Sequence, residues 1–121
     1  MLINLSNHPS TKWSAPQKKA AQDQFGQVID HAFPHIPPAW TMDEVVTKAK
    51  EILNEIKTKY HSDTAYVILI AGEQSFVVAM VDLCRQEEIT CYNATSDRIV
   101  TENSDGSKNV KFEFIKFRKL I

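Results

Sequence analysis

The feature that most constrains the fold is an unbroken run of aromatic and branched apolar residues at 66–70, followed closely by Gly72. The run lacks the alternation typical of a strand with one face in water. It therefore indicates a strand covered on both faces, as in a parallel sheet. A mostly apolar block at residues 76–84 predicts a largely buried helix. The centre of the chain is thus a strand, a tight turn and a helix, and in open parallel sheets such turns lie where ligands bind.

Periodicity and capping signals predict further elements on both sides of this centre. They are a strand at 2–5, a helix between a cap at Ser14 and Gly26, a strand from Val28, a helix opened by a Thr41/Glu44 capping box, a strand at 89–92, and a hairpin turning at Asp105-Gly106. The order is β-α-β-α-β-α-β followed by a β-hairpin. Alternating strands and helices predict a mostly parallel sheet with helices on both faces. The predicted fold is α/β: one small Rossmann-like domain over residues 1–121 with a C-terminal β-hairpin.

Charge and composition exclude several classes of partner. The chain has 14 basic and 15 acidic residues and a net charge of −1, which argues against binding to duplex nucleic acid or to a membrane surface. Cys84 and Cys91 fall in a predicted helix and a predicted strand, where buried core residues are expected more often than a disulfide. The N-terminus is too short and uncharged for a signal peptide, so a cytoplasmic protein is predicted.

Known catalytic and cofactor motifs are missing from the sequence. The turn at residues 72–75 is not a Walker loop, the first loop is not a GxGxxG fingerprint, and Ser75 does not lie in a GxSxG elbow. Cysteine and histidine do not occur with metal-ligand spacing. We therefore expect no metal, no dinucleotide cofactor and no α/β-hydrolase chemistry.

Three polar segments are predicted to meet at one edge of the sheet. If the first and third strands are neighbours, the carboxyl-end loops at residues 6–13, 72–75 and 95–98 converge at the switch point of the sheet. Two helix starts would direct backbone N–H groups into the same space, which suits an anion such as phosphate. The candidate ligand-binding residues are Ser6, Asn7, Ser10, Lys12, Gly72, Glu73, Gln74, Ser75, Thr95 and Ser96. His8 and Arg98 are the candidate catalytic residues.

Several of these residues also have a purely structural interpretation. His8 contacts a ligand or caps a turn in its own loop. Ser75 is interpreted foremost as the N-cap of the buried helix. Trp13 is interpreted foremost as a core residue and otherwise as a platform for a base. Arg98 either binds phosphate with its guanidinium or pairs with a neighbouring carboxylate.

The chain resembles small stand-alone proteins linked to type III CRISPR systems, which carry a CRISPR-associated Rossmann-fold (CARF-like) domain. The matching segments are residues 4–10 (NLSNHPS), the Gly72-Glu73 turn after the apolar strand, and residues 96–98 (SDR) before the terminal strands. The resemblance covers the general layout of the chain. Some proteins of this group are ring nucleases.

The resemblance implies a homodimer that binds a cyclic oligoadenylate across its axis and cleaves it without a metal or other cofactor. A ribose 2′-OH attacks the adjacent phosphorus and leaves a cyclic 2′,3′-phosphate. Arg98 and Lys12 would balance the charge, backbone N–H groups at residues 72–75 would hold phosphate oxygens, and His8 would act as acid or base. The alternative is a non-catalytic nucleotide sensor or a protein-interaction module of the same fold.

Overall fold

The apolar run forms the inner strand of a five-stranded sheet, next to the N-terminal strand. The computed structural model describes residues 1–60 and 65–121. Its elements are β1 (Leu2–Ser6), a 3-10 turn η1 (Ser10–Lys12), α1 (Ala15–Phe25), β2 (Val28–Asp30), α2 (Met42–Lys59), β3 (Val67–Ala71), α3 (Gln74–Gln86), β4 (Cys91–Glu102) and β5 (Lys108–Lys119). The predicted α/β class and the C-terminal hairpin are confirmed.

The strand order is β2-β1-β3-β4-β5, with β5 antiparallel to β4 and the other neighbours parallel. Leu2 pairs with Val67 and Ser6 with Ala71, so β1 and β3 run in register along their whole length. The chain winds outward in both directions from this central pair, which confirms the predicted switch point between the first and third strands. Parallel strands end at one edge, and loops gather there.

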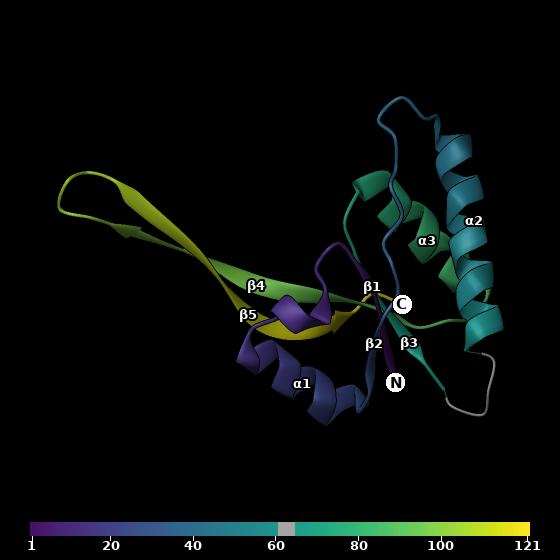
Figure 1. The fold of residues 1–121 in the computed structure, drawn as a ribbon, viewed down its shortest axis with the longest axis horizontal. Helices are drawn as coiled ribbons and strands as arrows, with labels where there is room; N and C mark the ends of the chain where they lie inside the picture. The colour runs from purple at the N-terminus through teal and green to yellow at the C-terminus, as the bar shows by residue number, and fades with distance from the viewer. Residues whose placement is uncertain (61–64) are drawn as a thin grey trace.

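Helices cover both faces of the sheet (Figure 1). Side chains alternate between the two faces of a strand, so neighbouring residues of β1 enter different cores. Ile3 and Leu5 pack in the larger core beneath α2 and α3. Leu2 packs in the smaller core beside α1, with Trp13 and other buried residues. Asn4 and Ser6 share this second face with Leu2, and both are buried.

Local capping signals are largely correct at the helix ends. Thr41 and Glu44 form the expected capping box at α2, and Ser14 accepts the N–H of Gln17 at α1. The interpretation of Ser75 as the N-cap of α3 is wrong. That helix begins at Gln74 and its N-cap is Glu73, whose longer carboxylate accepts backbone N–H groups in the first turn.

The predicted polar loop at residues 95–98 is also wrong, because these residues lie inside β4. The fourth strand and the first strand of the hairpin are one continuous strand that pairs with β5 from Tyr92 to Glu102, with a β-bulge at Thr95/Ser96. Its outer part, residues 97–113 with the connecting turn, extends away from the helices as a two-stranded ribbon (Figure 1). We call this ribbon the arm. Polar residues are tolerated there because the ribbon is exposed while its backbone groups are paired across the strands.

Both cysteines are free and buried, as the sequence indicates. Hydrogen bonding with Cys91 and burial together raise the pKa of the Cys84 thiol. A protonated thiol in an apolar core is a poor nucleophile, so Cys84 is a packing residue.

Candidate functional site

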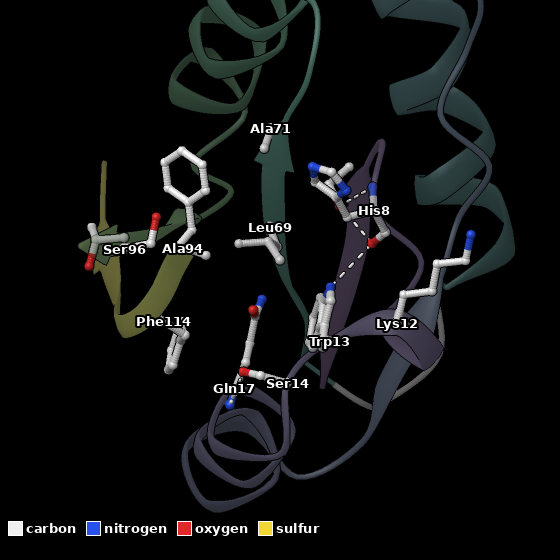
Figure 2. A pocket seen from close by; sticks show the side chains of 13 residues that line it. His8, Lys12, Trp13, Ser14, Gln17, Leu69, Ala71, Ala94, Ser96 and Phe114 are labelled. Atoms are coloured by element: carbon white, nitrogen blue, oxygen red, sulfur yellow. Dashed lines mark hydrogen bonds between the residues drawn. The ribbon is translucent and has the colours of Figure 1, made fainter. Parts of the chain in front are cut away.

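A pocket of about 410 Å³ opens at the carboxyl edge of β1 and β3, on the same face of the sheet as α1 (Figure 2). Ser6 and Ala71, the last residues of the two strands, are among its lining residues. The first loop and the start of α1 form one side, and β4 and β5 form the other. The lining residues are Ser6, His8, Lys12, Trp13, Ser14, Gln17, Leu69, Ala71, Ala94, Thr95, Ser96, Phe112 and Phe114.

The pocket brings together part of the predicted site. His8 and Lys12 lie on the side of the first loop, and Ser96 lies across the pocket on the hairpin side (Figure 2). Ser6 and Thr95 complete the predicted residues in the lining. They meet because β1 and β4 flank β3, so the first loop and the bulge of β4 lie across β3 from each other.

The turn at residues 72–75 does not contribute to this lining, as far as the described residues go. Gly72 has a φ of 142° and its Cα faces the ring of Phe33. The Glu73 carboxylate accepts the N–H groups of Phe76 and Ser75 at 2.8 and 3.1 Å. These bonds hold the pKa of Glu73 below its ordinary value, and the bond from Phe76 has the larger effect. Gln74 and Ser75 are the first residues of α3, so the whole turn serves that helix.

Two other predicted residues, Asn7 and Ser10, lie outside the lining of the main pocket. Asn7 lines a shallow depression beside Asp30 and His31. The Ser10 hydroxyl donates to Asp30 at 3.0 Å, and its backbone N–H also points at that carboxylate. Ser10 therefore helps to fix the loop through Asp30, and neither residue lines the main pocket.

A buried polar network holds the first loop in place. Asn4, only 1% exposed, donates from its amide nitrogen to Asp30 and to the backbone carbonyl of His8, both at 2.9 Å. The Ser6 hydroxyl lies 2.7 Å from Asn4 Oδ1 and accepts the His8 N–H at 3.2 Å. Trp13 donates its indole N–H to the same His8 carbonyl at 3.2 Å. The peptide groups of His8 are thus held by side chains from β1 and the loop.

Sequence reasoning missed Asn4 and Asp30 as parts of this site. The usable signal was an amide inside an otherwise apolar strand, since a buried polar side chain needs partners. Asp30 ends β2, the strand next to β1, so its carboxylate is the expected partner at the same edge.

The lining of the pocket is basic, hydroxylated and aromatic. Lys12 is its charged residue and His8 its ionisable ring; among the described residues, no carboxylate lines it. Ser14 and Ser96 offer hydroxyl protons, whereas the Ser6 hydroxyl is already bonded to Asn4 and His8. The rings of Trp13, Phe112 and Phe114 add flat apolar surface. An anion that carries an aromatic group matches this combination.

Arg98 lies just outside the lining. It pairs with Phe112 across the hairpin, one same-face position beyond the pair Ser96 and Phe114. Cross-strand partners share a face, so Arg98 continues the pocket side of the hairpin outward. Lys12, not Arg98, is the cationic residue of the lining, and its side chain extends away from Leu69 and Gln17 on the outer side of the first loop (Figure 2).

Over residues 1–60 and 65–121, no group of three or more His, Cys, Asp and Glu side chains is placed to hold a metal ion. No helix in the described part of the chain is long and apolar enough to cross a bilayer.

Fold and site together define a small α/β protein with a basic, aromatic pocket at the switch point of a doubly wound sheet. The chain belongs to the MJ1673 family: the model described as "Uncharacterized protein MJ1673 family" matches residues 1–118. Comparisons with curated proteins and with solved structures gave no match.

Proposed function

We propose that the protein binds a cyclic oligoadenylate in the switch-point pocket and cleaves it as a metal-independent ring nuclease. One observation carries the proposal: a pocket with a lysine, a histidine, several hydroxyls and exposed aromatic surface, but no lining carboxylate among the described residues. Phosphate is attracted by the cation and not repelled, while adenine can stack on an aromatic ring. The resemblance to CARF-like proteins supports the same ligand class.

The proposed reaction is internal transfer at phosphorus. The ribose 2′-oxygen attacks the adjacent phosphorus, the bond to the 5′-oxygen breaks, and a cyclic 2′,3′-phosphate and a 5′-hydroxyl form. A base takes the 2′-OH proton, and an acid protonates the leaving 5′-oxygen. The imidazole of His8 is the side chain in the pocket suited to proton transfer near neutral pH. In this proposal the Lys12 ammonium turns towards the bound ligand and offsets the charge that grows on the phosphoryl oxygens.

The second candidate is a sensor that binds the same ligand without cleaving it. His8 is the one imidazole among the described residues of the lining, and a concerted transfer needs both a base and an acid. With Lys12 as the remaining ionisable group, proton transfer to the leaving oxygen is the weaker part of the site. Ligand binding depends on neither step.

The test is incubation with cyclic tetra-adenylate and cyclic hexa-adenylate in the presence of a chelator. Products ending in 2′,3′-cyclic phosphate support the ring nuclease. A raised melting temperature without product supports the sensor. If neither nucleotide is cleaved and neither shifts the melting temperature, both candidates are rejected.

Replacement of Lys12 tests the pocket directly. Lys12→Ala should lower turnover by about 10²–10³, the usual cost of losing one positioned charge donor. In the sensor case it should weaken ligand binding instead. Lys18→Ala is the matched control, since Lys18 is an exposed lysine of the neighbouring helix α1 outside the pocket lining. An equal effect of both variants would show only a general charge effect and would contradict the assignment.

A further inference from the structure

The arm exposes apolar side chains that its own ribbon cannot cover. Val100 is 42% exposed, Val110 48% and Phe112 65%. Each strand of the arm has only the other as a neighbour among the described strands, and a two-stranded ribbon alone in water is marginally stable. An exposed apolar surface of this kind usually marks an interaction site.

Strand register places these residues on one face. The pairs Arg98–Phe112, Val100–Val110 and Glu102–Lys108 follow one another at every second position of β4 and β5. Their side chains therefore form one continuous surface. It continues inward to Ser96 and Phe114, which line the pocket. We call this surface the pocket-side face of the arm.

We propose that the pocket-side face of the arm binds the same face of a second copy of the chain. The two arms lie face to face and antiparallel, about a two-fold axis that passes between the Val100–Val110 pairs of the two copies. The inference concerns association and holds whether or not the pocket cleaves nucleotides.

Charge complementarity selects a second copy as the occupant. In this arrangement each β4 lies opposite the β4 of the partner and runs in the other direction. A residue two positions before Val100 therefore faces the partner residue two positions after Val100, and the same holds for β5 about Val110. Arg98 therefore faces the partner's Glu102, and Phe112 faces the partner's Lys108. The first contact is an ion pair and the second a cation–π contact, each made twice by symmetry. The valines meet at the centre of the interface.

A dimer could also form by pairing the exposed edges of two β5 strands, but charge disfavours this arrangement. β5 is the last strand of the sheet, and its charged side chains are mostly basic. They are Lys108, Lys111, Lys116, Arg118 and Lys119, against the single acidic residue Glu113. Two such edges repel each other, as expected of protected edge strands.

The arrangement also brings the partner to the pocket. Ser104, in the turn of the arm, lies as far beyond Val100 as Ser96 lies before it. Antiparallel arms therefore place the turn of each copy above Ser96 and Phe114 of the other. The mouth of each pocket is then formed by both copies.

The first test is the mass of the full-length protein in solution, measured by light scattering and sedimentation over a range of concentrations. The wild type should be a dimer. Val110→Glu should lose the dimer, while Ile99→Glu should keep it. Ile99 is a neighbouring arm residue of similar exposure, 38%, but its side chain projects from the opposite face. A wild-type monomer at all concentrations, or equal loss with Ile99→Glu, would overturn the proposal.

A charge exchange tests the antiparallel register. Arg98→Glu alone and Glu102→Arg alone should each shift the equilibrium towards monomer, and the double variant should restore the dimer. A double variant that remains monomeric would reject the Arg98–Glu102 contact. Val78→Glu tests the other exposed apolar surface, on α3, where Val78 is 56% exposed. Loss of the dimer in this variant but not in Val110→Glu would place the interface on α3 and overturn the proposal.

Discussion

At the scale of single residues, Gly72 occupies a position that excludes a side chain for two reasons. Its φ of 142° lies in a region that residues with a Cβ rarely adopt, and a Cβ would overlap the ring of Phe33. Phe33 in turn packs edge-on against Phe76, with ring centroids 5.2 Å apart, so displacing its ring would disturb that contact.

Gly72→Ala should therefore destabilise the protein by about 1–3 kcal/mol from backbone strain, with the overlap adding to that cost. Thermal or urea unfolding measures the loss. Gly26→Ala is the control, because Gly26, at the end of α1, also has a positive φ, 79°, but a methyl group added there would meet no described atom within 4 Å. Gly72→Ala should cost more than the control, because of these positions only Gly72 would also bring a methyl group against Phe33. Equal losses would mean that the ring moves aside freely.

The sequence predicts which polar residues lie near the site, but not which of them line the pocket. Ser6, His8 and Lys12 lie at the end of the first strand or just after it, so strand order alone brings them to the pocket. Gly72 and Glu73 follow the neighbouring strand just as closely, yet they serve α3. Sequence position identifies the edge of the sheet on which a residue lies, but not whether its polar atoms are already used in a cap.

At the scale of elements, the stabilisation of the first turn of α3 by Glu73 depends on pH. Its carboxylate accepts the N–H groups of Phe76 and Ser75, and these bonds lower its pKa. A carboxyl with a depressed pKa in the folded state stabilises the fold above its ordinary pKa. That contribution is lost as the pH falls through the folded-state value.

Glu73→Gln should thus lower the melting temperature most at neutral pH. The difference from the wild type should shrink as the pH falls below about 4.5, the ordinary pKa of this carboxyl. Melting curves of both proteins from pH 7 to pH 3 give the comparison. A difference that is constant with pH would mean that the charge of Glu73 does not act on the helix.

Element order was predictable, whereas the extent of β4 was not. Caps such as Thr41 and Ser14 act within a few residues, so the sequence reports them directly. The residues Asn93 to Asp97 are turn formers by composition, yet they continue β4 because β5 supplies partners for their backbone groups. Those partners come from more than a dozen residues further along the chain, beyond the reach of local pattern.

At the scale of the whole molecule, the arm and the rest of the protein, which we call the body, contribute differently to stability. The buried apolar clusters lie between the sheet and its helices, and Phe117 is the buried residue of β5 that they contain. The residues of the arm from 97 to 113 are all exposed. The arm is therefore expected to contribute little to the free energy of unfolding of a single copy.

Replacing residues 97–113 by an Asn-Gly turn tests this expectation. Ser96 and Phe114 face each other across the strands, which is the geometry that a two-residue turn joins. The shortened protein should keep its circular dichroism spectrum and melt within a few degrees of a wild-type monomer, but should not dimerise. Loss of the folded spectrum would show instead that the arm is needed to stabilise the body.

The strand β4 belongs to two structures at once, since its inner half closes the pocket and its outer half forms the arm. A ligand in the pocket and a second copy on the arm would therefore contact the same strand. Thermodynamic reciprocity then applies: if occupancy strengthens subunit association, association must strengthen occupancy by the same factor. In that case the ligand concentration needed to fill the pocket would fall as the protein concentration rises.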